Sequence, residues 1–110
     1  MPKRGEVWWV NFDPAVGVEI RKRRLAVVVS NDAANRHLNR VQVVPLSSQV
    51  DRIYPSEAPV SFQGRAGKAM ADQLTTVSKL RLVDCGGSLT AGEMAAVERA
   101  ILIQLGMFGG

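Results

Sequence analysis

The apolar positions of the chain fall into short runs separated by polar turns, and only the last run has the spacing of a helix. Strands are expected where β-branched and aromatic residues cluster between Gly, Pro, Asn and Asp. The second run contains an uninterrupted apolar segment, 25–29, which is typical of a strand buried on both faces. The whole pattern predicts six strands, at residues 6–12, 25–30, 41–46, 58–62, 68–77 and 82–89.

The segments around these strands carry their own signals. Residues 31–38 are rich in Asn and Asp, which predicts a turn with at most one loose helical turn. Pro45 predicts that the end of the third strand lies at a sheet edge or a bend. Thr90 and Glu93 form a capping-box pattern at the start of a helix that Gly106 ends. The apolar stripe of that helix is expected to consist of Met94, Val97, Ile101 and Leu105.

Several short strands followed by one amphipathic helix predict a mainly β (α+β) fold. We expect a small, strongly bent antiparallel sheet or open barrel with the C-terminal helix packed on it. A length of 110 residues is enough for one core, so residues 1–110 are expected to form a single domain. The apolar tail, 107–110, leaves two interpretations open: a frayed end or part of a subunit contact.

The charge of the chain is unevenly distributed. The formal net charge is +4, and residues 1–40 hold eight cations against four anions, whereas residues 41–110 hold six of each. Such a one-sided excess favours a surface that binds a polyanion, and nucleic acid is the natural one. A membrane surface is disfavoured because the basic run lacks amphipathic helical spacing.

The basic run lies immediately before the buried second strand. Arg21, Lys22, Arg23 and Arg24 are consecutive, and Arg24 stands where a flexible loop becomes rigid strand. Its planar guanidinium stays charged and can bind two phosphate oxygens at once. The alternative is that these four residues form a solvated hairpin tip.

Other kinds of site are disfavoured by composition. The chain has one histidine, His37, no Cys/His cluster and no close carboxylate pair, so no metal site is predicted. The segment 64–67 lacks the Lys-Ser/Thr ending of a phosphate loop. Cys85 cannot form an internal disulfide and is expected to be a small buried residue. No long apolar segment follows the N-terminus, which points to a reducing cytoplasm and no membrane.

RNA can be cleaved by so simple a set of residues because it carries its own nucleophile. The 2′-hydroxyl can attack the adjacent phosphorus if the protein aligns it and neutralises the charge that grows on the phosphoryl oxygens. Arg24 and Ser47 are the catalytic candidates, since each lies at the end of a buried strand that can hold it rigidly.

The order of several short motifs resembles that of the MazF/PemK toxin family, over nearly the whole chain. Each motif is weak alone, but their collinearity is specific. The motifs are residues 4–8, 13–14 with 17–19, Arg24 followed by 27–32, 44–48, 71–73 and 96–100.

This resemblance implies a homodimeric, metal-independent, sequence-specific endoribonuclease of a type II toxin–antitoxin system, acting on single-stranded RNA without a cofactor. It implies a fold of the MazF/CcdB type and an antitoxin whose acidic, disordered tail covers the same basic groove. The family arginine matches Arg24 and the family hydroxyl matches Ser47. The predicted RNA-binding residues are Glu19, Asn31 and Gln73, which match the family groove, together with Arg21, Lys22 and Arg23.

Two departures from the family pattern bear on the site. Leu25 stands where the family usually has proline, so Arg24 loses a stiffening neighbour, and Ser47 replaces the more frequent threonine. Two other functions remain open: a non-catalytic toxin of the same fold that poisons DNA gyrase, and a protein-binding barrel. The adjacent residues Trp8 and Trp9 are expected to face opposite ways, one toward the core and one toward the surface.

Overall fold

The structure, a computed structural model, describes residues 1–12 and 23–107 of the chain. Strands are the most frequent element, and a short helix and a long C-terminal helix accompany them. The strands are β1 (Glu6–Asn11), β2 (Arg23–Val28), β3 (Arg40–Ser47), β4 (Glu57–Phe62), β5 (Arg65–Met70), β6 (Thr75–Ser78) and β7 (Leu82–Ser88). The helices are α1 (Asp32–His37) and α2 (Ala91–Gln104), with 3₁₀ turns η1 (Ala71–Gln73) and η2 (Lys79–Arg81).

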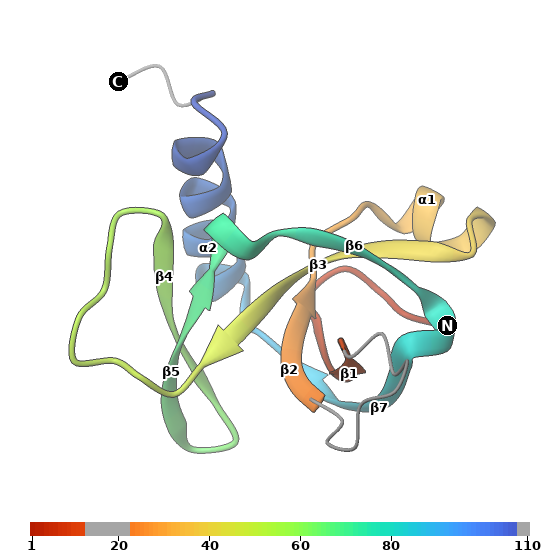
Figure 1. The fold of residues 1–110 in the computed structure, drawn as a ribbon, viewed down its shortest axis with the longest axis horizontal. Coiled ribbons are helices and arrows are strands. Elements are labelled where there is room, and N and C mark those ends of the chain that lie inside the picture. Colours follow the sequence, from red (N-terminus) through yellow and green to blue (C-terminus); the bar gives the residue numbers. More distant parts are fainter. Residues whose placement is uncertain (13–22, 108–110) are drawn as a thin grey trace, which may run out of the picture.

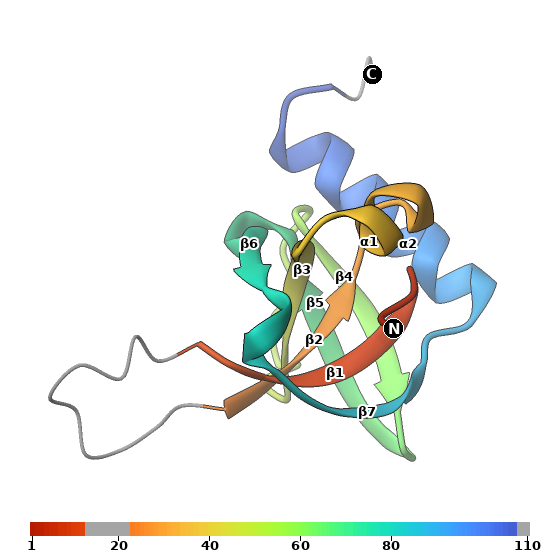
Figure 2. The same ribbon diagram turned by 90° about the vertical axis from the view of Figure 1, so that its right-hand side faces the viewer.

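The strands form a bent antiparallel sheet in the order β4-β5-β3-β2-β1-β7, with β6 paired to β3. Figures 1 and 2 show how strongly the sheet curls and how α2 lies along one side of it. The helix packs on β4 and η1. This arrangement confirms the predicted mainly β fold with a C-terminal helix.

Strand β2 is buried on both faces, as its run of apolar residues predicts. Ala26, Val27 and Val28 have no exposed surface. Val27 belongs to the core cluster beneath α2, whereas Ala26 and Val28 belong to a second cluster formed with β1, β3 and β6. Burial of each valine contributes about 1.5–3 kcal/mol, so β2 is a rigid base for the residues just before it.

Strand β3 is the centre of the sheet. Along one edge it pairs with β2, from Val43 to Pro45. Along the other edge it pairs first with β6, up to Val43, and then with β5, from Leu46. Pro45 therefore does not lie at a sheet edge; it lies where the second partner of β3 changes, which agrees with the predicted bend.

The predicted strand at 68–77 is wrong, because it is two strands, β5 and β6, separated by η1. The two strands pair with opposite ends of β3, so the chain has to turn between them. Ala71, at this turn, is buried in the cluster beneath α2. The sequence of a strand does not reveal which strand it pairs with, so a change of partner cannot be read from the apolar pattern.

Both helices begin with a side-chain cap. Asn31 accepts the amide of Ala34 at the start of α1, in the segment predicted as a turn. The predicted capping box of α2 is confirmed: the Glu93 amide donates to Thr90 Oγ at 3.1 Å, and the Thr90 amide donates to Glu93 Oε1 at 2.9 Å. The Thr90 amide, together with the Ser61 amide that donates to Glu93 Oε2, lowers the pKa of the Glu93 carboxyl.

The predicted stripe and end of α2 are confirmed only in part. Met94 and Val97 are buried and Ile101 is half-buried, but Leu105 is 54% exposed. Leu105 lies beyond the last helical residue, and Gly106 follows it with a φ of +70°. A glycine in the left-handed region is the usual helix stop, so the predicted end is correct while the last position of the stripe is not.

The expectation that Cys85 is buried is wrong, because the residue is exposed. It lies on β7, which is the last strand in the sheet order and pairs only with β1 among the described strands. No described strand therefore covers the outer edge of β7 at this position. The contrast between Trp8 and Trp9 is as predicted: Trp8 packs against the second cluster, and Trp9 is 41% exposed.

Gly67 allows β5 to approach β3 closely, so we expect Gly67→Ala to destabilise the fold. A Cβ at this position would lie 2.9 Å from the backbone oxygen of Ser47, which forces the two strands apart. The expected loss is about 1–3 kcal/mol in the free energy of unfolding, measured by denaturant titration. Gly92→Ala is the matched control, because its Cβ would meet only Thr90 Oγ at 4.0 Å. Equal stability of the two variants would contradict the role of Gly67.

Candidate active site

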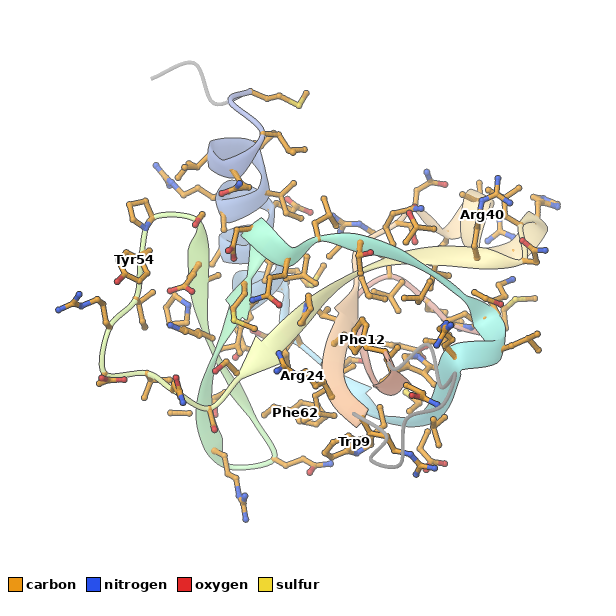
Figure 3. The ribbon with its side chains drawn as sticks, viewed as in Figure 1. Trp9, Phe12, Arg24, Arg40, Tyr54 and Phe62 are labelled. Carbon is orange, nitrogen blue, oxygen red and sulfur yellow. The ribbon has the colours of Figure 1, made fainter. Side chains whose placement is uncertain are left out.

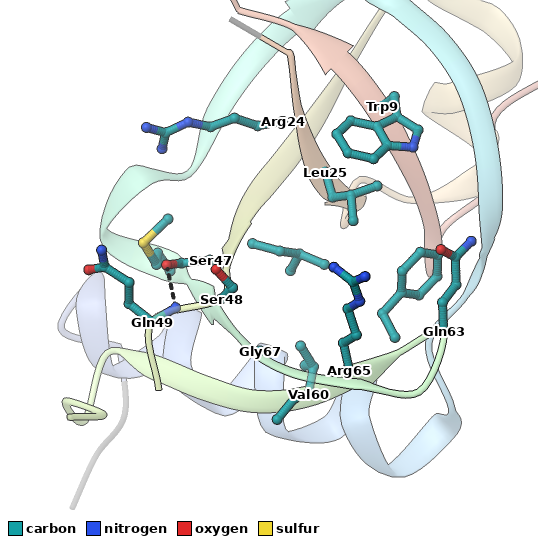
Figure 4. A pocket seen from close by; sticks show the side chains of 14 residues that line it. Trp9, Arg24, Leu25, Ser47, Ser48, Gln49, Val60, Gln63, Arg65 and Gly67 are labelled. Atoms are coloured by element: carbon teal, nitrogen blue, oxygen red, sulfur yellow. Dashed lines mark hydrogen bonds between the residues drawn. The ribbon is translucent and has the colours of Figure 1, made fainter. Parts of the chain in front are cut away.

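A pocket of about 740 Å³ opens on one side of the bent sheet (Figure 4). Five strands contribute to it, together with the turns that follow β3 and β4. Both polar and apolar side chains line it. The lining residues are Trp9, Arg24, Leu25, Leu46, Ser47, Ser48, Gln49, Val60, Phe62, Gln63, Arg65, Ala66, Gly67 and Met70.

The two predicted catalytic residues line this same pocket although 23 positions separate them in sequence. Arg24 is exposed and lies at the start of β2, directly before the rigid segment of that strand. Ser47 is the last residue of β3, and its Oγ accepts the amide of Gln49 at 3.1 Å. That hydrogen bond fixes the hydroxyl oxygen and leaves its proton available for a ligand.

Aromatic side chains form another wall of the pocket. Figure 3 places Trp9, Arg24 and Phe62 in one region of the molecule, away from Arg40 and Tyr54. The Phe62 ring lies on the glycines of β7: a Cβ at Gly86 would come within 3.1 Å of its Cζ. The ring can pack this closely because Gly86 and Gly87 of β7 have no side chains. An exposed indole and a phenyl ring offer faces on which a nucleobase can stack.

Arg65 is the pocket residue that sequence reasoning missed. It is the first residue of β5, is exposed, and extends into the pocket in Figure 4. The segment 64–67 that contains it lacks the Lys-Ser/Thr ending of a phosphate loop, so that motif does not point to Arg65. The signal that could have found Arg65 is a single cation among small residues at the tip of a predicted hairpin, where its side chain has room to reach a ligand.

No described acidic side chain compensates the charge in the pocket. Two arginines line it, and no described lining residue is a carboxylate. Among the described residues, neither Arg24 nor Arg65 has an acidic partner within 4.0 Å. A pocket with two unpaired guanidinium groups favours an anionic ligand.

The loop after Ser47 is held by a buried ion pair. Lys68 Nζ lies 3.0 Å from Glu57 Oε1 and donates to the backbone oxygen of Arg52 at 2.9 Å. The two side chains of the pair are 10% and 9% exposed. The Tyr54 amide also donates to Glu57, and this bond, followed by Lys68, lowers the pKa of the Glu57 carboxyl against the opposing effect of burial. In the β3–β5 ladder Lys68 is the partner of Ser47, so the anchor lies next to the site.

The predicted RNA-binding residues are not all brought together. Asn31 caps α1 and Arg23 begins β2, and neither lines the pocket. Gln73 does not line it either, but its Nε2 lies 3.7 Å from the sulfur of Met70, which does. Glu19, Arg21 and Lys22 lie outside the described residues.

The described residues meet the requirements of neither a metal site nor a membrane-spanning helix. In residues 1–12 and 23–107, no group of three His, Cys, Asp or Glu side chains is placed to hold a metal ion. His37 is exposed at the end of α1 and does not line the pocket. No helix in the described part of the chain has the length and apolar character needed to span a bilayer.

The sequence matches a known family over most of its length. A family model described as "PemK-like, MazF-like toxin of type II toxin-antitoxin system" matches residues 3–105. The chain is 35% identical over 117 residues to the endoribonuclease MazF9 of Mycobacterium tuberculosis, covering 98% of this chain and 99% of that protein. It is 32% identical over 107 residues to the endoribonuclease toxin MazF of Escherichia coli K12, covering 96% of each.

Solved structures of toxins also resemble this fold closely. An endoribonuclease in complex with its cognate antitoxin, from a Mycobacterial species, has a TM-score of 0.83 at 27% identity and covers 97% of both chains. A MazE–MazF complex from Deinococcus radiodurans has a TM-score of 0.81 at 29% identity and covers 96% of both.

We expect Lys68→Met to lower the free energy of unfolding by about 3 kcal/mol, because it leaves the Glu57 carboxylate buried without its cation. Denaturant titration measures the loss. Lys3→Met is the control, since Lys3 is exposed and its side chain has no ion pair with a described residue, and we expect it to change stability by no more than about 0.5 kcal/mol. Adding Glu57→Leu to Lys68→Met should restore part of the stability; equal losses for Lys68→Met and Lys3→Met would mean that the pair does not anchor the loop.

Proposed function

Because the chain belongs to the PemK-like, MazF-like toxins of type II toxin–antitoxin systems, we propose that its pocket is an active site that cleaves single-stranded RNA. Its endoribonuclease activity follows from its likeness, over nearly its full length, to proteins named endoribonucleases. The observation that supports this particular pocket is the presence of Arg24 and Ser47 on it, on separate strands and with no described carboxylate among the lining residues.

The reaction uses the RNA as its own nucleophile. The 2′-oxygen forms a bond to the adjacent phosphorus while the bond from phosphorus to the 5′-oxygen breaks, leaving a cyclic phosphate and a free 5′-hydroxyl. Charge grows on the non-bridging oxygens during this step. The Arg24 guanidinium neutralises that charge, and its remaining N–H groups can bind the leaving oxygen. The Ser47 hydroxyl donates to a second oxygen and fixes the phosphate in line for attack.

Proton transfer is left to groups other than the described lining residues. Those residues include no carboxylate and no imidazole, and arginine does not lose its proton in proteins. The proton of the attacking hydroxyl therefore passes to solvent or to a residue outside the described part of the chain, and the leaving 5′-oxygen takes up a proton from the same sources to become the 5′-hydroxyl. The contribution of Arg24 and Ser47 is electrostatic stabilisation and alignment, which need no metal ion.

The partners follow from the same charges and from an exposed apolar face. An antitoxin segment that carries carboxylates would neutralise Arg24 and Arg65, and structures of similar toxins are complexes with their antitoxins. Leu102, Ile103 and Leu105 are exposed at the end of α2, which supports a homodimer. We place residues 1–110 in the cytoplasm as one toxin domain. Gyrase poisoning is not favoured, since the curated relatives are named endoribonucleases.

Arg24→Ala is expected to reduce the rate of RNA cleavage by about 10²–10³-fold, because it removes the group that meets the growing charge. Ser47→Ala should cost about tenfold, the value of one hydrogen bond to a charged group, and Ser47→Thr should keep most of the activity. Cleavage of a defined RNA, followed by primer extension, measures both. The control is Arg36→Ala, an exposed arginine on α1 outside the pocket. A folded Arg24→Ala variant that cuts at the parent rate would refute the assignment.

Cleavage by the unaltered protein is expected to continue at the same rate in excess EDTA. The reason is that the described residues offer no metal-ligand cluster and that a guanidinium supplies the positive charge instead. The same primer-extension assay, run with and without chelator, measures this. Loss of cleavage in EDTA that added Mg²⁺ restores would mean that the mechanism is wrong.

A further inference from the structure

The pocket holds one more cation than the cleavage step requires. Arg24 is sufficient for the single negative charge of the scissile phosphodiester, yet Arg65 enters the same pocket from a different strand (Figure 4). No described carboxylate on the pocket balances either of them. A guanidinium that faces the ligand and has no acidic partner among the described residues favours a second anionic group on that ligand.

Arg65 is held more rigidly than its exposure suggests. It pairs with Phe62 across a two-residue hairpin, Gln63–Gly64, whose φ angles are +52° and +78°. Two consecutive positive φ values are typical of the type I′ turn, which matches the twist of the flanking strands. The turn fixes where the Arg65 side chain leaves the backbone.

The hairpin is also tied to β7 at two points. The Gln63 Nε2 donates to the backbone oxygen of Gly86 at 3.2 Å, and the Phe62 ring packs against the Gly86 and Gly87 backbone. Because the turn is anchored at two points, binding a ligand has to order the Arg65 side chain but not the backbone that carries it. Arg65 is thus preorganised for contact with the substrate.

We propose that Arg65 binds a non-scissile phosphate of the same RNA strand, so that the pocket grips two phosphates, one with each arginine. This inference rests on the proposed function, because the RNA must enter the pocket at Arg24 and Ser47. Single-stranded RNA carries one negative phosphate for every nucleotide. When the phosphate to be cleaved lies at Arg24, neighbouring phosphates of the same strand therefore lie near the pocket, where Arg65 can bind one of them. Arg65 then determines how tightly the strand is held and leaves the chemical step to Arg24.

The competing role for Arg65 is a contact with a base. A guanidinium can bind O6 and N7 of guanine in the same bidentate manner as it binds a phosphate. The two roles differ in which change to the RNA abolishes the contact. A phosphate contact is abolished by neutralising one phosphate, and a base contact by replacing one guanine with 7-deazaguanine. The experiment therefore changes the RNA and the protein together.

Binding is measured on an RNA that contains the mapped cut site with a 2′-deoxy nucleotide there, so that no cleavage occurs. Methylphosphonate replaces one phosphate at a time on either side of the scissile one. For the unaltered protein, neutralising one particular non-scissile phosphate should weaken binding about 10- to 100-fold. Arg65→Ala should show the same loss on the unmodified RNA and no further loss on that methylphosphonate.

Three further readouts separate a phosphate contact from a structural role. Arg65→Ala should lower the slope of log binding constant against log salt by about 0.7, the value for one phosphate of a single strand, whereas Arg36→Ala should not. Arg65→Lys should recover part of the affinity. In cleavage, Arg65→Ala should raise KM by the same factor as the affinity loss and keep kcat within about threefold.

The proposal is overturned if the loss of affinity caused by Arg65→Ala multiplies with the loss caused by each methylphosphonate, because no single phosphate would then be the partner of Arg65. It is also overturned if the affinities of Arg65→Ala and the unaltered protein become equal only on RNA that contains 7-deazaguanine. It is also overturned if Arg65→Ala lowers kcat like Arg24→Ala, which would place it at the reacting phosphate. An unaltered protein that binds RNA with this phosphate dependence and does not cut it would refute the proposed function and leave the two-phosphate grip in place.

Discussion

The close approach of β5 to the end of β3 is the constraint on which the pocket depends. Ser47 ends β3 between two partners: the Arg24 strand on one edge and the Arg65 strand on the other. The approach is possible because Gly67 has no Cβ, since one would lie 2.9 Å from the Ser47 backbone oxygen. Hydrogen bonding between strands therefore sets the relative positions of three polar side chains that come from distant parts of the sequence.

Rigidity is supplied from beneath the pocket. Residues 26–28 are buried on both faces of the sheet, directly after Arg24. The Lys68–Glu57 ion pair holds the loop that follows Ser47, and the Phe62 contact with β7 holds the hairpin before Arg65. Each polar group of the pocket thus extends from backbone that is fixed by burial, by charge or by close packing. Preorganisation of this kind is what allows a few groups to stabilise a transition state.

Local sequence signals predicted local structure well. The strand pattern, the Thr90–Glu93 capping box and the Gly106 helix stop depend on residues a few positions apart, and each is found in the structure. Predictions that depended on a distant partner were less successful. The division of 68–77 into two strands follows from the two ends of β3, and the exposure of Cys85 follows from the edge position of β7. No short-range pattern contains that information.

The same limit explains the site residues. Arg24 and Ser47 could be predicted as candidates because each lies at the end of a buried apolar strand, a feature visible in sequence. Arg65 was missed, because it does not adjoin a buried apolar strand and reaches the pocket through the β4–β5 hairpin. Asn31 was predicted to line an RNA groove, and its side chain caps α1 in the structure. The cap is what the structure describes for this side chain, and the RNA contact of Asn31 stays a prediction.

The charge distribution shows why the pocket is positive although half of its cations come from a neutral part of the chain. Residues 41–110 carry equal numbers of cations and anions, and yet Arg65 belongs to them. Three acidic residues of that part are engaged elsewhere: Glu57 with Lys68, Glu93 with the amides of Thr90 and Ser61, and Glu98 with Arg4 at 2.7 Å. The lowered pKa values of Glu57 and Glu93 have the same origin, because these carboxylates are stabilised by the partners they hold. These three carboxylates are held in structural contacts, and no described carboxylate lines the pocket beside its two arginines, which leaves both available to an anionic substrate.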